Sequence, residues 1–190
     1  MADYAPLISP GFTGACIQEV QDCSPAWEVG LEPGMHITHI EGQPLRDMIQ
    51  WMWEGDGVEL SVQGIDLDGD PFDILLQRDP GQSWGIVFTD CIFDGLMTCR
   101  NACSFCFMHM LPKGMRKPLY LQDDDYRLSF LQGNFVTLTN VGEKDLQRII
   151  DLNLSPLHVS LHAVDPQVRQ EMMGPNAQRG FDVQIGRAHV

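Results

Sequence analysis

Charge divides the chain into two segments, and this division limits the fold more than any other feature of the sequence. Residues 1–90 contain 16 acidic and 2 basic residues, whereas residues 91–190 contain 10 of each. Four of the six cysteines also lie in the second segment. Two segments of such different composition predict two domains, with a boundary near residues 79–90 that we place after residue 80.

The acidic excess, a net charge of -14, argues against nucleic acid as a partner, because neutralising phosphates requires a basic face. No apolar run reaches the roughly 18 residues of a membrane-spanning helix, and the first residues lack the basic and apolar regions of a signal peptide. We therefore predict a cytoplasmic protein without a membrane partner. In that compartment the cysteines are expected as metal ligands or free thiols and not as disulfides.

The first segment has the pattern of a small β-rich module. Short apolar or alternating runs predict strands at residues 14–20, 35–40, 58–62 and 72–76. Ser24 followed by Pro25 predicts the start of a short helix, and a second helix is expected over residues 46–53. The aspartates of Asp66–Asp70 resemble a calcium loop without its final glutamate, so we interpret this stretch as a polar turn.

The stretch SPAWEVGLEPGMHITHIEGQPLRD, residues 24–47, resembles the core of a PDZ domain. It contains a short helix, a G-L-x-P-G sequence that leads into a strand, and a turn with the sequence G-Q-P-L. The resemblance covers residues 5–78 and predicts a PDZ-like domain over residues 1–80. It implies an extended peptide ligand that adds a strand to a sheet edge. The alternative is a module that only docks on the rest of its own chain.

Cys99, Cys103 and Cys106 form the strongest local motif, C-x3-C-x2-C. Three thiols on one loop can converge on a single metal centre, so these cysteines are the predicted metal ligands. A structural zinc needs a fourth ligand, which His109 would supply in a Cys3His site. A [4Fe–4S] cluster held by three cysteines instead keeps one iron open for another ligand. The other three cysteines lack such spacing and are expected to pack as small apolar residues.

With Phe105 before its third cysteine, the loop resembles the cluster motif of the radical SAM superfamily, C-x3-C-x-aromatic-C. The resemblance implies a [4Fe–4S] cluster whose open iron binds the amino and carboxylate groups of S-adenosyl-L-methionine. An electron from an external donor then cleaves the sulfonium bond, and a 5′-deoxyadenosyl radical abstracts hydrogen from a substrate. In this superfamily the aromatic residue lies beside the adenine; simple packing of the loop is the alternative role of Phe105.

Downstream of the motif, the sequence has the pattern of a parallel βαβ unit. Strands are predicted at residues 134–140 and 156–162, with a helix over residues 142–152 between them. This order resembles the middle strands of radical SAM barrels, in which strand ends face the cofactor. The resemblance gives three candidate contacts for S-adenosyl-L-methionine: Asn140, Ser160 and, near the ribose, His162. Ordinary polar residues at strand ends are the alternative interpretation.

The Gly-Gly-Glu triplet that radical SAM enzymes commonly carry is missing from this sequence. We expect either residues 139–140 or residues 123–125 to take its place. The basic cluster of the chain consists of Lys113, Arg116, Lys117 and Arg127. Pairing of these side chains with Asp123–Asp125 is the favoured interpretation, and binding of a carboxylate or phosphate ligand is the alternative.

The whole run from residue 94 to residue 140, with phrases such as LPKGMRK and DDDYRLSFL, closely resembles one bacterial family. Its members are radical SAM iron–sulfur oxidoreductases with an N-terminal PDZ-like domain and a C-terminal domain of unknown function. The resemblance covers residues 5–180 and implies an enzyme of unknown substrate. The alternatives from other classes are a Cys3His zinc-binding structural module and a PDZ-type peptide-binding adaptor.

The end of the chain is expected to be artificial, because residues 185–190 resemble a translated sequencing adapter. Arg187 and His189 would then have no function. Residues 81–184 have room for about three βα units, fewer than a barrel needs. The predicted fold class is therefore α/β plus a small β-rich module: a PDZ-like domain followed by an incomplete radical SAM (β/α) partial barrel. Such a fragment is expected to be inactive by itself, or even to fold poorly.

Overall fold

The computed structural model of the protein describes residues 14–179. The predicted adapter-derived segment, residues 185–190, lies outside the described residues. The chain divides into two compact units, Met1–Gly95 and Leu96–Val190, and each is described by itself. Within the described range, no helix is both long enough and apolar enough to cross a membrane.

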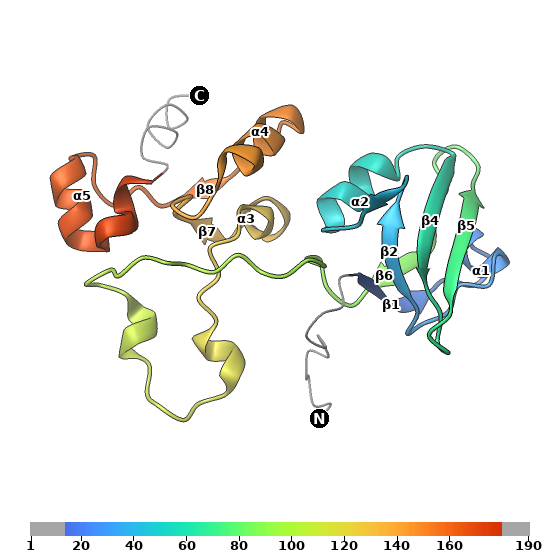
Figure 1. The fold of residues 1–190 in the computed structure, drawn as a ribbon, viewed down its shortest axis with the longest axis horizontal. Helices are drawn as coiled ribbons and strands as arrows, with labels where there is room; N and C mark the ends of the chain where they lie inside the picture. Colours follow the sequence, from blue (N-terminus) through green and yellow to red (C-terminus); the bar gives the residue numbers. More distant parts are fainter. Residues whose placement is uncertain (1–13, 180–190) are drawn as a thin grey trace. The chain divides into compact units, whose positions relative to one another are not determined.

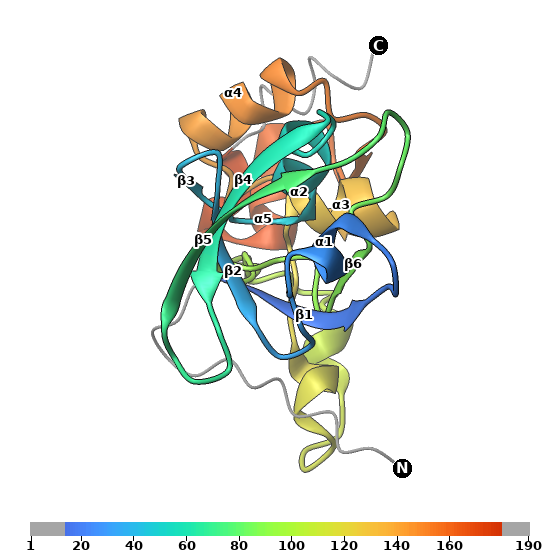
Figure 2. The same cartoon turned by 90° about the vertical axis from the view of Figure 1, so that its right-hand side faces the viewer.

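The first unit is built on one antiparallel sheet (Figures 1 and 2). Its strands lie in the order β5-β4-β2-β1-β6, and the short β3 pairs with β2. Its elements are β1 (Ala15–Val20), α1 (Pro25–Glu28), β2 (His36–Ile40), β3 (Gln43–Pro44), α2 (Met48–Glu54), β4 (Glu59–Ile65), β5 (Pro71–Gln77) and β6 (Ile86–Phe88). The predicted β-rich character of this segment is confirmed.

Side-chain caps start both helices of this unit. The Ser24 hydroxyl accepts the Trp27 backbone N–H at 3.2 Å, and Pro25 occupies the first turn of α1. At α2 the Asp47 carboxylate accepts the Gln50 N–H at 2.9 Å. Each cap satisfies a backbone donor that has no partner inside the helix, which fixes where the helix begins.

The Asp66–Asp70 stretch is a polar turn, as interpreted from the sequence. The Asp66 carboxylate accepts the backbone N–H groups of Asp68 at 3.0 Å and Asp70 at 2.8 Å. These bonds close the hairpin between β4 and β5, in which Ile65 lies opposite Pro71. One carboxylate oxygen of Asp66 therefore stabilises the turn.

The core of the first unit lies on one face of the sheet, and the last strand, β6, contributes Phe88 to it. The buried apolar side chains include Ile17, Ile37, Leu60, Trp51 and Phe88. The Trp51 and Phe88 rings meet edge to face, with their centroids 5.0 Å apart. Because Phe88 belongs to β6, which pairs with β1, the compact unit extends beyond residue 80. The domain limits drawn from the sequence stay predictions.

Replacement of Gly64 by alanine is expected to destabilise the first unit by about 1–3 kcal/mol. A Cβ at this position in β4 would lie 2.2 Å from the His36 carbonyl oxygen and 2.3 Å from the Phe72 ring. The backbone of β2 would have to move to make room. Denaturant unfolding followed by tryptophan fluorescence measures the effect, since all four tryptophans lie in this unit. Gly57→Ala, whose Cβ meets its nearest atom at 3.3 Å, is the milder control; equal effects of the two variants would contradict the prediction.

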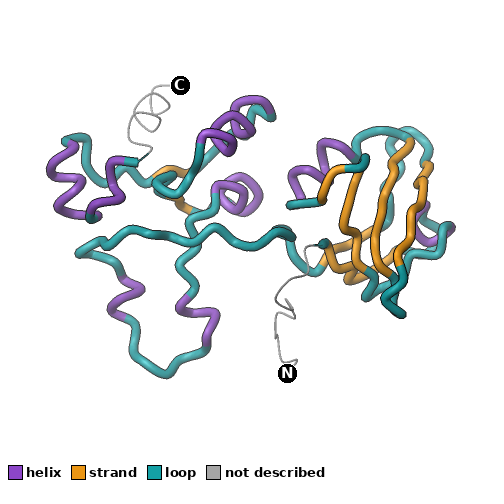
Figure 3. Tube along the Cα trace, viewed as in Figure 1, coloured by secondary structure: helices purple, strands orange, loops and turns teal. Residues whose placement is uncertain are grey.

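The second unit consists mostly of loops around one parallel strand pair (Figure 3). Its elements are the 3-10 helices η1 (Phe107–Met110), η2 (Lys117–Tyr120) and η3 (Pro175–Gln178), the helices α3 (Tyr126–Gln132), α4 (Glu143–Asp151) and α5 (Pro166–Met173), and the strands β7 (Phe135–Val136) and β8 (His158–Val159). In the second unit, a long segment without sheet structure precedes α3 and carries η1 and η2 (Figure 1).

The predicted βαβ unit is present, and its strands are shorter than predicted. Strands β7 and β8 pair in parallel, with Phe135 opposite His158, and α4 connects them. Strand β7 ends at Val136 because the next backbone N–H, that of Thr137, donates to the Asp124 carboxylate at 2.6 Å. Leu138 then takes a left-handed φ of 54°, which no strand residue adopts. A mixed α/β fold is thus confirmed, while the partial barrel and the PDZ-like fold stay predictions.

Candidate functional site

Backbone pairing holds the start of the cysteine loop beside the acidic run 123–125. Thr98 and Asp123 form an isolated antiparallel bridge. The Cys99 N–H donates to the Gln122 carbonyl at 2.8 Å, and the Asp124 N–H donates to the Met97 carbonyl at 3.0 Å. The first cysteine therefore lies on a two-stranded segment whose position is fixed from the neighbouring chain.

The middle of the loop is held by the end of α5. The Ala102 N–H donates to the Met173 carbonyl and the Ser104 N–H to the Met172 carbonyl, both at 2.9 Å. Gly174 follows with φ 85° and ψ -174°, a conformation open essentially to glycine alone. A Cβ at Gly174 would also lie 3.1 Å from the Ala102 side chain. The end of the helix thus supplies the acceptors that shape the loop between Cys99 and Cys106.

The three cysteines are free thiols of intermediate burial, and they lie within electrostatic reach of one another. Burial raises the pKa of Cys99 and of Cys103, and negative charge on the other thiols of the loop raises both further. No three His, Cys, Asp or Glu side chains within residues 14–179 already converge as a metal site. The donor set, three thiols on one half-buried loop, nevertheless fits an iron–sulfur cluster. His109, the fourth ligand of the zinc alternative, lies exposed in η1.

A polar network joins this loop to the end of β7. The Asn101 amide nitrogen lies 3.5 Å from the Cys99 sulfur, 3.0 Å from the Thr137 hydroxyl and 2.9 Å from the Thr139 hydroxyl. Asp124 accepts both the N–H and the hydroxyl of Thr137 at 2.6 Å. Thr139 belongs to the strand end that the sequence offered in place of the Gly-Gly-Glu triplet, whereas sequence reasoning did not single out Asn101 or Thr137. Two patterns in the sequence could have indicated this network: an asparagine between two cysteines of the motif, and two threonines separated by one residue just before Asn140.

Asn140 presents a buried acceptor at the same strand end. Its amide nitrogen donates to the Thr98 carbonyl at 3.2 Å and to the Asp124 carbonyl at 2.9 Å. Its side-chain oxygen is buried and has no hydrogen-bond partner among the described residues. A buried acceptor without a partner is costly, so this oxygen is suited to a donor on a bound molecule. Ser160 follows β8, and its N–H donates to the Val136 carbonyl at 2.8 Å.

Phe105 and His162 come together although 57 residues separate them in the chain. Their ring centroids are 4.9 Å apart. His162 follows β8 with a left-handed φ of 64°. Burial lowers its pKa, and the charge of Arg169, itself fully buried, lowers it further. The structure thus brings two of the sequence-predicted cofactor residues into one aromatic pair beside the cysteine loop.

Acidification is expected to destabilise the second unit through His162. Because the folded pKa lies below the unfolded value of 6.5, the unfolded chain binds a proton that the folded unit resists. The free energy of unfolding therefore falls as the pH drops through 6.5 toward the folded pKa. His162→Asn, which tolerates the left-handed backbone, is expected to lose less stability between about pH 7.5 and about pH 5.5. Hydrogen exchange of the α4 amides measures this, and equal losses in both proteins would refute it.

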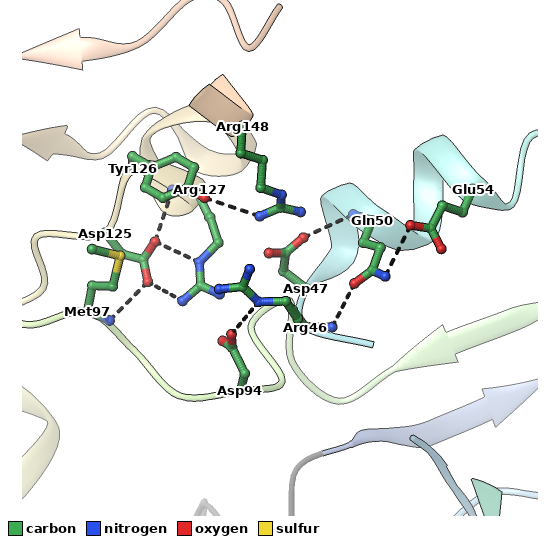
Figure 4. A network of polar contacts seen from close by, with 10 residues as sticks. All are labelled: Arg46, Asp47, Gln50, Glu54, Asp94, Met97, Asp125, Tyr126, Arg127 and Arg148. Carbon is green, nitrogen blue, oxygen red and sulfur yellow. Dashed lines mark hydrogen bonds and ion pairs between the residues drawn. The ribbon is translucent and has the colours of Figure 1, made fainter. Parts of the chain in front are cut away.

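One residue of the basic cluster, Arg127, forms an ion pair with Asp125 in the acidic run. Arg127 donates to Asp125 through its Nε at 2.9 Å and its Nη2 at 2.7 Å, and Asp125 also accepts the Met97 N–H at 3.0 Å (Figure 4). Both charged side chains are almost completely buried. The expected pairing is therefore present at Arg127. The other basic residues, Lys113, Arg116 and Lys117, lie exposed around η2.

Comparison with known proteins places this site in a family. A search of curated proteins gives no match. The model of the radical SAM-like domain matches residues 78–187, more than half of the chain, and this range contains the cysteine loop and both parallel strands. The match does not favour the zinc module or the peptide adaptor as the main function. The chain belongs to the radical SAM-like domain family.

Proposed function

We propose that the second unit holds a [4Fe–4S] cluster through Cys99, Cys103 and Cys106 and binds S-adenosyl-L-methionine at the ends of β7 and β8. The observation that carries this proposal is the network from Cys99 through Asn101 to Thr137 and Thr139. It joins the three-thiol loop to the carboxyl end of a parallel strand, where sites of parallel α/β folds are generally found.

The residues of the loop have distinct tasks in this proposal. A bound cluster would supply the electron for reductive cleavage of S-adenosyl-L-methionine. The thiolates of Cys99, Cys103 and Cys106 would hold that cluster. The backbone bonds from Ala102 and Ser104 to the end of α5 keep the ligands on one loop. The substrate and the external electron donor are unidentified partners, and a cytoplasmic location is part of the proposal.

Four side chains are proposed to contact the second cofactor. The Asn140 side-chain oxygen offers an acceptor to a donor such as the amino group of S-adenosyl-L-methionine, the task of the missing Gly-Gly-Glu triplet. The Phe105 ring supplies an apolar face for the adenine, and His162, packed against it, lies near the ribose. Burial keeps His162 neutral near pH 7, so that it can both donate and accept a hydrogen bond. Ser160 is the remaining candidate contact, from the end of β8.

The test compares two asparagines at opposite ends of β7. Asn140→Ala removes the buried acceptor, whereas Asn134→Ala removes an amide that donates to Asp123 at 2.8 Å before the strand begins. After anaerobic reconstitution, equilibrium dialysis with S-adenosyl-L-methionine is expected to show binding about 10- to 100-fold weaker for Asn140→Ala. Both variants are expected to keep their iron. Equal affinities in the two variants, or no binding by the unaltered protein, would contradict the proposal.

For the first unit we propose peptide binding, as its PDZ-like sequence implies. The support is a seven-residue edge strand, β5, which pairs along one side with β4. No strand within residues 14–179 pairs with its other side, which leaves backbone groups for an added strand. A library of peptides with free carboxyl termini, selected on the whole chain, is expected to give binders that shift β5 amide resonances. Absence of any such binder would contradict this proposal.

A further inference from the structure

Asn101 lies inside the cysteine motif, and its side chain contacts one of the thiols. Its amide nitrogen is 3.5 Å from the Cys99 sulfur, within the range of an N–H···S hydrogen bond. Two threonines beyond β7 contact the same amide. Asn101 therefore connects Cys99, a proposed cluster ligand, to the end of β7. Its side chain does more than fill a position between two cysteines of the motif.

A carboxylate fixes the direction of the hydrogen bond between Asn101 and Thr137. Asp124 accepts the Thr137 hydroxyl at 2.6 Å, so the oxygen of that hydroxyl is left to accept from Asn101. The Thr139 hydroxyl lies 3.2 Å from the Asn101 side-chain oxygen and 2.9 Å from the Thr137 hydroxyl, and it can donate its one proton to either. The amide nitrogen faces the Cys99 sulfur, so one of its two N–H groups can donate to the sulfur.

Burial limits the access of water to the far end of this network. Thr139 is 3% exposed and Asp124 is 2% exposed, whereas Asn101, Thr137 and Cys99 are half-buried. The side chain of Asn101 is thus the donor that this network places next to the Cys99 sulfur.

We propose that Asn101 is a positioning residue whose side-chain N–H donates to the Cys99 sulfur and thereby raises the reduction potential of the bound cluster. This inference rests on the proposed function. Reduction adds negative charge that spreads onto the ligand sulfurs, and a hydrogen-bond donor stabilises that charge. Without the donor, the reduced cluster is less stable and its midpoint potential becomes more negative.

The experiment compares two asparagines that both bind the cysteine loop. Asn101→Ala removes the donor to the sulfur. Asn176→Ala removes an amide that donates at 2.7 Å to the carbonyl of Arg100, in the same loop, without contacting a sulfur. Each protein is reconstituted anaerobically with iron and sulfide, its iron is counted, and its midpoint potential is determined by a redox titration followed by EPR.

The expected result is an unchanged iron content in all three proteins and a more negative midpoint potential for Asn101→Ala alone. Thr137→Val, which loosens the amide without removing it, is expected to shift the potential in the same direction by less. An Asn101→Ala potential equal to that of the unaltered protein, or an equal shift in Asn176→Ala, would overturn this inference and leave the proposed function standing. Absence of iron from the unaltered protein would overturn both.

Discussion

Replacement of Cys103 by alanine is expected to reduce the iron bound after anaerobic reconstitution from about four atoms per chain to almost none. Cys103 is the middle thiol of the loop, and it lies within electrostatic reach of both Cys99 and Cys106. Two thiolates cannot hold the cluster with a single open iron. The characteristic absorption and the EPR signal of the reduced sample are expected to disappear together with the iron.

Cys16→Ala is the matched control for this variant. Cys16 is also a free thiol of intermediate burial, but it lies in β1 of the first unit. The control is expected to bind as much iron as the unaltered protein. If Cys103→Ala retained its iron, or if Cys16→Ala lost it, the assignment of the ligands to residues 99, 103 and 106 would be wrong.

Replacement of Asp125 by alanine is expected to destabilise the second unit by about 3–5 kcal/mol. The carboxylate is completely buried, caps α3 by accepting the Arg127 N–H at 3.0 Å, and binds the Arg127 guanidinium. Its removal leaves a buried positive charge without this partner and frees the Met97 N–H. Since every tryptophan lies in the first unit, hydrogen exchange of the α3 amides is the appropriate measurement.

Asp123→Ala separates this effect from a general loss of acidic charge. Asp123 is only partly buried, and its carboxylate accepts one bond from Asn134. We expect a loss of stability below about 1 kcal/mol for this control. Protection of the α3 amides that is equal in Asp125→Ala and Asp123→Ala would show that the buried pair does not stabilise the unit.

Local sequence signals predicted much of the fold. The N-cap at Ser24, the polar turn at Asp66 and the helix that follows Gly142 each depend on residues within a few positions of one another. The parallel pairing of β7 with β8 followed from the strand–helix–strand pattern. The pairing of Arg127 with the acidic run followed from opposite charges two residues apart.

Contacts between distant segments could not be predicted in this way. The strands were predicted too long, because nothing local shows that Asp124 captures the Thr137 N–H. The support of the cysteine loop by the end of α5 runs through backbone carbonyls, which carry no sequence signal. Asn101 was overlooked for a related reason: a spacer position of a motif accepts many residues, and its contacts with two threonines appear only in the folded chain.

The most direct measurement is a count of the metal bound after anaerobic reconstitution with iron and sulfide, combined with EPR of the reduced protein before and after addition of S-adenosyl-L-methionine. The account predicts about four irons per chain and an EPR signal that changes when S-adenosyl-L-methionine is added. Retention of zinc without uptake of iron, or a cluster whose signal is indifferent to S-adenosyl-L-methionine, would contradict it.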